Sequence, residues 1–223
     1  MHLWTIRLLL TAVGMTLAMS GLPAAERKAD QAAPSAEELA ARLQARYGTI
    51  RDFSADFSQT FTGILMKRPT TEKGRVLVKK PLRVRFTYES PDRKEFVSDG
   101  SQFYSYFQES RYGTRTPLPR ESEQSTALLF LAGRGNLARD FTPSLAGQPA
   151  VDEWHLTLVP KQVQTDFQTL TLFVDRRTLV LRGFGTTDEQ GKNTIRFTNI
   201  RENRGLTEKD FVFKFPPGTE FGG

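Results

Sequence analysis

Apolar and polar side chains alternate with a period of two along most of this chain, which is the pattern of half-buried β-strands. Phe53, Phe57 and Phe61 fall on one side of such a strand, and Ser54 and Ser58 fall on the other. Strand-like patterns recur in residues 74–79, 82–88, 95–98, 102–108, 112–117, 154–159, 167–175, 179–186, 194–202 and 211–215. About ten strands with short connections predict one large antiparallel sheet rather than βαβ units.

A helical period appears directly before the first strand. Ser35 is placed as an N-cap, and Leu39, Leu43 and Tyr47 follow at spacings of four, so they form one apolar stripe. Gly48 is placed to end the element. We therefore expect one amphipathic helix ahead of the sheet.

Residues 126–132 form a second helical segment, which is apolar on nearly every side and is followed by Gly133 and Gly135. A helix with this pattern must be covered on every side. It fits as a plug or lid within a curved sheet, and an ordinary core helix is an equally open alternative.

The N-terminus has the organisation of a secretory signal peptide. A short basic start ends at Arg7, an apolar run covers residues 8–22, and small residues lie at Ala24 and Ala25. A membrane anchor is the rival reading, but Gly14 and Ser20 interrupt the apolar run, which is also short for a span. Cleavage after Ser20 and cleavage after Ala24 both remain open.

These observations predict a signal peptide at residues 1–25, a flexible lead-in at 26–34 and a single domain at 35–223. We expect the exported product to be periplasmic and soluble, since the mean hydropathy is −0.43. The chain has no Cys, so neither a lipid-attachment cysteine nor a disulfide is available. The net charge is +6, and export argues against nucleic acid as the partner of that charge.

The residues favour binding over catalysis. His155 is the only histidine outside the signal peptide, so histidine-dependent nucleophile pairs and metal clusters are not expected. It lies in a strand pattern and fits a surface position or a paired position on that strand. Asp99 and Asp175 stand at turns, where a structural role is commoner than acid–base work. Arg83 and Arg85 alternate with core-type residues and fit the solvated face of a strand. We expect no enzyme activity, no cofactor and no metal.

Several segments, taken in order, resemble the LolA family of periplasmic carriers of outer-membrane lipoproteins. They are Phe53-Ser54-Ala55-Asp56-Phe57-Ser58-Gln59, Gly74 to Pro81 leading into Arg85-Phe86-Thr87-Tyr88, Val97-Ser98-Asp99-Gly100, Leu128-Leu129-Phe130-Leu131, and Phe211 to Gly218. Each segment is weak alone, but their order and spacing are specific, and together they span nearly all of the expected domain.

The resemblance implies a mainly β, α+β fold: an unclosed, strongly curved antiparallel sheet, or half-barrel, with a helical lid over an apolar cavity. It also implies a monomeric chaperone that takes acylated lipoproteins from an inner-membrane ABC transporter complex and passes them to an outer-membrane receptor. An exported sensor or scaffold of the same fold, binding acylated ligands or lipopolysaccharide, is the alternative. A hydrolase with two carboxylates converging in the concavity ranks third.

The expected site residues fall into three groups. Leu128, Leu129, Phe130 and Leu131 form the lid, and Lys80 is the candidate lid latch. The acyl-chain cavity is expected to be lined by Val84, Phe86, Tyr88, Phe103, Leu156, Leu158, Leu170, Leu172, Phe197 and Phe213. Only the set as a whole favours a pocket, and simple core packing stays open as the alternative for each residue.

Two positions depart from the best-known family members. Those members carry Arg where this chain has Lys80, so the latch would be weaker or would be supplied by Arg83 or Arg85. The sequence also continues only five residues past Gly218, without the C-terminal extension of some members.

Overall fold

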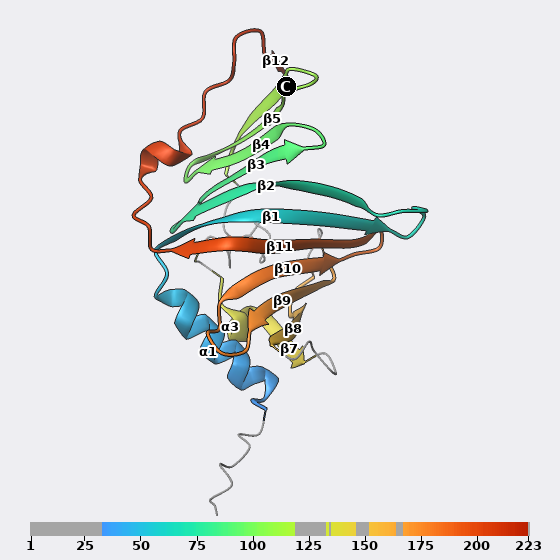
Figure 1. Cartoon of the computed structure of the whole chain (residues 1–223), viewed down its shortest axis with the longest axis vertical. Coiled ribbons are helices and arrows are strands. Elements are labelled where there is room, and N and C mark those ends of the chain that lie inside the picture. Colours follow the sequence, from blue (N-terminus) through green and yellow to red (C-terminus); the bar gives the residue numbers. More distant parts are fainter. Residues whose placement is uncertain (1–32, 119–132, 134, 146–151, 164–166, 223) are drawn as a thin grey trace, which may run out of the picture. The chain divides into compact units, whose positions relative to one another are not determined.

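The computed structural model describes all residues except 1–32, 119–132, 134, 146–151, 164–166 and 223 (Figure 1). The chain divides into two units, Met1–Ala33 and Pro34–Gly223, and every element below belongs to the second. No helix among the described residues has the length and apolar character needed to cross a membrane.

A single twelve-stranded sheet dominates the second unit (Figure 1). Its strands are β1 (Asp52–Gly63), β2 (Thr70–Lys79), β3 (Arg83–Ser90), β4 (Lys94–Asp99), β5 (Gln102–Phe107), β6 (Tyr112–Pro117), β7 (Phe141–Leu145), β8 (Glu153–Pro160), β9 (Thr169–Asp175), β10 (Leu181–Thr187), β11 (Gly191–Glu202) and β12 (Glu220–Phe221). The spatial order is β12-β6-β5-β4-β3-β2-β1-β11-β10-β9-β8-β7. The predicted open, curved antiparallel sheet is confirmed, with the parallel pairing of β12 and β6 as its one exception.

The sheet consists of two meanders joined at their longest strands. Strands β1 to β6 follow one another in space, as do β7 to β11, and β1 pairs antiparallel with β11 through partners such as Phe57 and Phe197. Glycines stand at two of the register shifts where the strands bend. An added Cβ at Gly74 would lie 2.0 Å from the Thr87 carbonyl oxygen, and one at Gly183 would lie 2.2 Å from the Ile195 carbonyl oxygen. Only glycine permits this close backbone approach.

Helix α1 (Ala36–Gly48) begins and ends where the sequence predicts. The Ser35 hydroxyl accepts a hydrogen bond from the Glu38 backbone N–H at 3.1 Å, and Leu39, Leu43 and Tyr47 are buried. The short helix α3 (Leu137–Asp140) packs between α1 and β7. The apolar stripe of α1 thus covers the β7–β8 end of the sheet.

One predicted strand is wrong. Residues 211–215 form no strand, although Phe211, Phe213 and Phe215 recur at every second position, with Val212 and Lys214 between them. A 3₁₀-helix, η2 (Glu208–Phe211), lies against β3 and β4 and is followed by an irregular segment. Phe213 contacts Tyr104 and Tyr106 with ring centroids 5.7 and 6.2 Å apart, so side-chain packing onto the sheet replaces ladder pairing.

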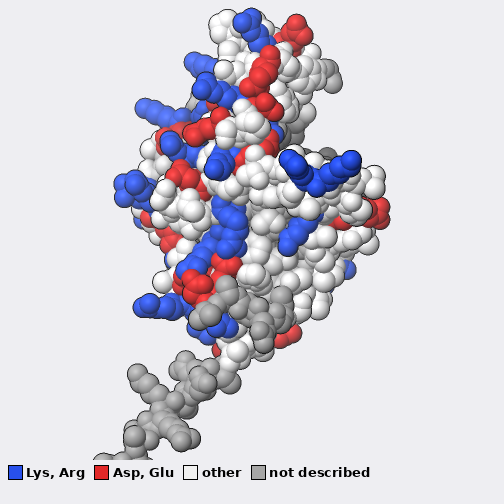
Figure 2. Space-filling view, turned by 45° about the vertical axis from the view of Figure 1, so that its right-hand side comes forward, with Lys and Arg blue, Asp and Glu red and all other residues white. Residues whose placement is uncertain are grey.

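The two faces of the sheet differ in character. We call the face that packs with α1 the inner face, and it holds the main core, including Phe57, Val76 and Leu172. The other face, the outer face, carries ion pairs such as Arg85 with Glu95 at 2.7 Å. Basic and acidic side chains are interspersed on the side of the molecule seen in Figure 2. Arg83 and Arg85 both belong to the outer face, as the alternation predicts.

Candidate functional site

A continuous run of aromatic rings covers the inner face of β1, β3, β4 and β5. The ring centroid of Phe57 lies 5.4 Å from that of Phe86 and 4.9 Å from that of Tyr88. Tyr88 continues to Phe96 at 5.7 Å, and Phe96 stacks on Phe103 at 6.3 Å. Register explains the arrangement, because Val84, Phe86 and Tyr88 alternate along β3 and face the same side as their partners on β4.

The rings of this run are unequally covered. Tyr88 is 7% exposed, whereas Phe86, Phe96 and Phe103 are only half-buried. These three rings therefore form an apolar surface within the curved sheet that a ligand can contact. Sequence reasoning named Phe86 and Phe103 but missed Phe96, whose neighbours in Lys-Glu-Phe-Val-Ser do not alternate cleanly.

The opposite half of the inner face is filled by protein. Leu156, Leu158, Leu170 and Leu172 are at most 1% exposed, and they share one core cluster with Leu39 of α1. Phe197, at 6% exposure, lies between the two halves. Nine of the ten residues expected to line the cavity thus lie on one face, but seven of them belong to the packed core, and only Phe86 and Phe103 are half-buried.

Phe213 is the tenth, and its predicted place in the cavity is wrong. Its ring packs on Tyr104 and Tyr106, which point away from the face that carries Phe103. The predicted strand would have allowed an inner-face position. The irregular segment after η2 instead crosses the outer face.

A polar cluster borders the aromatic run at the ends of β1 and β3. The Tyr88 hydroxyl donates a hydrogen bond to Gln59 Oε1 at 2.5 Å, and Lys94 Nζ lies 4.6 Å above the Tyr88 ring while donating to Glu72 Oε1 at 2.7 Å. Burial raises the pKa of Tyr88 above its usual range, with the Glu72 carboxylate adding to the effect, so the hydroxyl stays a donor at neutral pH. The apolar surface therefore ends at a polar rim in which the charges of Lys94 and Glu72 neutralise each other. No pattern in the sequence predicted this rim.

Lys80, the candidate latch, follows β2 directly and reaches the end of α1. Its ammonium group donates to the Tyr47 carbonyl oxygen and lies 3.7 Å above the centre of the Tyr47 ring. Burial lowers the pKa of Lys80 to about 8, and the Glu202 carboxylate acts in the opposite direction. Arg46 of α1 holds that carboxylate at 2.6 Å. Lys80 thus ties the last turn of α1 to the sheet.

The predicted lid, Leu128 to Leu131, lies outside the described residues, and the chain just after it contacts the same site. At Gly133, where φ is +82°, an added Cβ would lie 2.4 Å from Lys80 Cδ. The Gly135 carbonyl oxygen accepts a hydrogen bond from Gln44 Nε2 at 3.4 Å. The segment leading out of the predicted lid therefore runs over the Lys80 side chain and onto α1.

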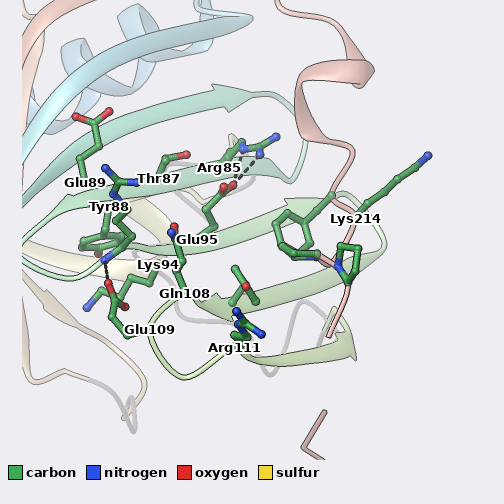
Figure 3. A pocket seen from close by; sticks show the side chains of 15 residues that line it. Arg85, Thr87, Tyr88, Glu89, Lys94, Glu95, Gln108, Glu109, Arg111 and Lys214 are labelled. Carbon is green, nitrogen blue, oxygen red and sulfur yellow. Dashed lines mark hydrogen bonds and ion pairs between the residues drawn. The ribbon is translucent and has the colours of Figure 1, made fainter. Parts of the chain in front are cut away.

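Arg83 and Arg85, the alternative latch residues, are engaged elsewhere. Arg83 pairs with Glu208 at 2.7 Å, and Arg85 donates to Glu95 at 2.7 and 3.0 Å and to the Asp210 carbonyl oxygen at 3.2 Å. Arg85 and Glu95 also border an open outer-face pocket of about 1140 Å³ (Figure 3). Charged side chains of both signs line it, which suits neither acyl chains nor an anionic ligand.

The carboxylates singled out in the sequence have structural roles. Asp99 accepts from the backbone N–H groups of Ser101 and Gln102, both at 2.8 Å, and Asp175 accepts from the Arg177 and Thr178 N–H groups. Both predicted turn roles are confirmed. Hydrogen bonds from Thr178 and Arg177 lower the pKa of Asp175 to about 2. Nowhere in the described chain do three or more His, Cys, Asp or Glu side chains gather as a metal would require.

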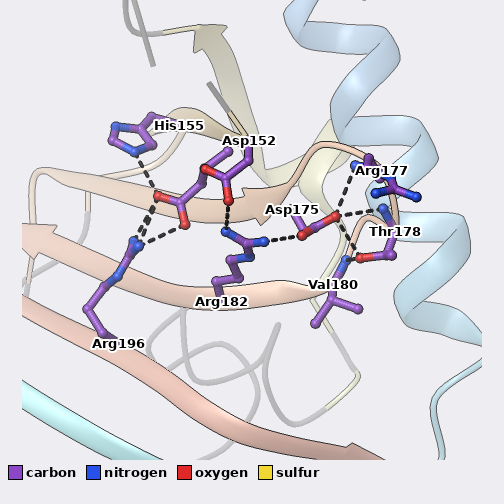
Figure 4. A network of polar contacts seen from close by, with 9 residues as sticks. Asp152, His155, Asp175, Arg177, Thr178, Val180, Arg182 and Arg196 are labelled. Atoms are coloured by element: carbon purple, nitrogen blue, oxygen red, sulfur yellow. Dashed lines mark hydrogen bonds and ion pairs between the residues drawn. The ribbon is translucent and has the colours of Figure 1, made fainter. Parts of the chain in front are cut away.

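His155 belongs to an outer-face ion network (Figure 4). Its Nε2 lies 2.9 Å from Glu153 Oε1, and the same buried carboxylate accepts from Arg196 at 2.8 and 3.0 Å. The Arg196 guanidinium also stacks over the Phe173 ring at 4.3 Å. The expected paired strand histidine is confirmed, and its partner is fully occupied by structural contacts.

Comparison with known proteins gives consistent matches. The family model described as "Outer membrane lipoprotein carrier protein LolA" matches residues 48–214. An outer-membrane lipoprotein carrier protein of Chromobacterium violaceum is 30% identical over 200 residues, covering 89% of this chain and 94% of the relative. One of Chromohalobacter salexigens is 29% identical over 210 residues, covering 94% and 93%.

Among solved structures, an uncharacterised conserved protein from Thermus thermophilus matches with a TM-score of 0.53 at 13% identity, covering 82% of this chain and 98% of that one. A LolA superfamily protein from Nitrosomonas europaea matches with a TM-score of 0.41 at 13% identity, covering 81% and 99%. The Thermus match shows a shared fold. With the family model spanning most of the sequence, the chain belongs to the LolA family of outer-membrane lipoprotein carrier proteins.

Proposed function

We propose that this protein carries the acyl chains of lipoproteins across the periplasm. It would receive them from an inner-membrane ABC transporter complex and deliver them to an outer-membrane receptor. The observation that carries the proposal is the half-buried aromatic surface of Phe86, Phe96 and Phe103 on the inner face. The names of the relatives supply the cargo class.

The chemistry of this surface fits reversible acyl binding. Each buried methylene gains about 0.8 kcal/mol, so an extended pocket would hold several chains too tightly for delivery. Because each ring is already half-buried by its neighbours, cargo removes only the remaining exposed part of the ring from water, which lowers the net gain. A receptor can then remove the cargo by offering only a modest difference in affinity.

Loading of a fluorescent fatty-acyl probe and of a purified acylated lipoprotein tests the proposal. Phe96→Ser removes a central ring of the surface, and we expect about tenfold weaker loading, which corresponds to about 1.4 kcal/mol of lost contact. Phe213→Ser makes the same substitution at a half-buried phenylalanine of the outer face and is the matched control. Equal loading of both variants, with circular dichroism showing both folded, would place the acyl site elsewhere.

Export is a separate part of the proposal. N-terminal sequencing of protein from the periplasmic fraction should show that roughly the first 20 to 25 residues are gone. An intact Met1 would contradict the signal-peptide prediction.

The lid and its latch complete the proposal. The Lys80→Leu variant should load cargo readily and pass it on poorly. If its lid opens more easily, the carrier binds cargo more tightly, and the receptor then gains less from taking the cargo over. Lys80→Arg should close the empty site more firmly, since a guanidinium can bridge two carbonyl acceptors. A transfer assay from loaded carrier to receptor measures the effect of each substitution. Identical transfer by wild type, Lys80→Leu and Lys80→Arg would mean that Lys80 does not act as a latch and only contacts α1.

A further inference from the structure

The turn between β1 and β2 exposes three consecutive large apolar side chains. Ile64 is 70% exposed, Leu65 97% and Met66 41%. Such turns usually take Gly, Asn, Asp or Ser, which suit both the backbone and water. Neither the fold nor the inner-face site uses these side chains, so their exposure needs another explanation.

The backbone of this turn is held in place. The Ile64 N–H donates to the Gln190 carbonyl oxygen at 2.9 Å, and the Met66 N–H donates to the Gly63 carbonyl oxygen at 3.1 Å. The Met66 side chain folds back over Gly63, where an added Cβ would lie 2.9 Å from Met66 Sδ. Leu65 is therefore presented outward by an ordered turn.

Two cations adjoin the apolar tip. Lys67 and Arg68 follow Met66 directly and are exposed, and neither has an ion-pair partner in the part of the chain that the structure describes. On the neighbouring β10–β11 turn, Asp188 is occupied by the N–H groups of Gln190 and Gly191 at 2.7 and 2.9 Å. Apolar side chains flanked by unpaired cations are the composition of segments that enter the headgroup region of anionic bilayers.

The position of the turn suits contact with a flat surface. β1 and β2 are long strands of 12 and 10 residues, and their turn projects beyond the β10–β11 turn beside it (Figure 1). Because neighbouring strands are antiparallel, the end of β8 lies at the same end of the strands as the β1–β2 turn. Val163, which follows β8, is 98% exposed there. A protruding convex tip matches a bilayer better than it matches a protein groove, which would have to enclose it.

We propose that the β1–β2 turn, residues 64–68, inserts into the surface of anionic phospholipid membranes. Leu65 and Ile64 would enter the acyl boundary, while Lys67 and Arg68 would meet the phosphate headgroups. This goes beyond carriage of cargo, because it assigns a membrane contact to a surface that lies apart from the acyl site.

Vesicle co-sedimentation without cargo tests the inference. Protein from the periplasmic fraction should bind vesicles of phosphatidylcholine and phosphatidylglycerol at 3:1 more tightly than pure phosphatidylcholine vesicles. The double variant Lys67→Gln/Arg68→Gln should bind the anionic vesicles about thirtyfold more weakly, at about fivefold per cation. Ile64→Ser/Leu65→Ser should lose about tenfold or more on both vesicle types. Glu189→Gln, beside the tip, should strengthen binding to the anionic vesicles.

Control variants remove exposed apolar and cationic side chains elsewhere. Val212→Ser takes an exposed apolar side chain from the outer face, and Arg177→Gln/Arg204→Gln removes two cations from the opposite edge of the sheet. We expect wild-type binding from both. The inference is overturned if the wild-type protein binds neither vesicle type, or if the tip variants bind as the controls do. If the wild-type protein binds neither vesicle type, the exposed apolar tip would instead be a contact surface for another protein.

Discussion

Replacing Lys80 with methionine tests how the end of α1 is joined to the sheet. The substitution removes the ammonium group that donates to the Tyr47 carbonyl oxygen and keeps most of the side-chain length. Burial lowers the pKa of Lys80 from its ordinary 10.5 to about 8 in the folded protein. Between these values the unfolded chain keeps its proton on Lys80 while the folded chain releases it. The wild-type free energy of unfolding should therefore rise as pH rises through this window.

The size of the effect follows from the two pKa values. The fall from 10.5 to about 8 sets a ceiling of about 3 kcal/mol, at about 1.4 kcal/mol per pH unit. Lys80 is only half-buried, so water screens part of the interaction. We expect an increase of about 1 to 2 kcal/mol between pH 7 and pH 10, relative to Lys80→Met.

Urea denaturation of wild type, Lys80→Met and Lys80→Arg between pH 7 and pH 10 measures this increase. Neither methionine nor arginine titrates there, so the difference between the two variants should stay constant with pH. Burial raises the pKa of Tyr47, and this affects all three proteins alike. A constant difference between wild type and both variants would refute a half-buried, destabilised ammonium group at this position.

Three further perturbations probe other parts of the molecule. Phe141→Ala should lower the free energy of unfolding by about 3 to 5 kcal/mol in urea, because the ring is 1% exposed and stacks on Phe167; a loss below about 1 kcal/mol would mean that the β7 end is loosely packed. Glu153→Gln should cost about 1 to 3 kcal/mol by thermal or urea unfolding, since Arg196 loses its buried carboxylate but remains partly hydrated; an unchanged stability would show that the ion pair only offsets its own desolvation. Leu129→Glu should impair acyl-probe loading while leaving the melting temperature nearly unchanged if residues 126–132 form a lid; loss of folding by circular dichroism would identify a core helix instead.

Periodicity predicts strands well where both neighbours are strands. The alternation of Phe53 and Phe57 with Ser54 and Ser58 corresponds to β1, because β2 and β11 flank it on both sides. The same alternation failed at Phe213, because period two records which face of the chain is apolar and not whether a ladder partner exists. The turn residues Asp99 and Asp175 were identified correctly because their hydrogen bonds are local in sequence.

The candidate site was only partly predictable for a related reason. Alternation along β3 placed Val84, Phe86 and Tyr88 on one face, and the structure confirms that placement. It could not distinguish Phe86, which stays half-buried, from Leu172, which is packed core at 1% exposure, because coverage depends on elements distant in sequence. The partner of Lys80 likewise lies on α1, 33 residues away, and no local pattern encodes it.

The joint between β1 and β11 has a consequence for how the chain acquires its structure. Phe57 must find Phe197 across most of the sequence, so this contact carries a large loop-closure cost that is met before the two meanders can form one sheet. A distant pairing of this kind forms more slowly than the hairpins within each meander, which close only short loops. Until the last long strand arrives, β1 presents an unpaired hydrogen-bonding edge to its surroundings, and open edges of this kind recruit other chains. A protein translocated N-terminus first would keep that edge exposed until nearly all of its residues had crossed, which makes early handling by general folding factors part of the cost of this topology.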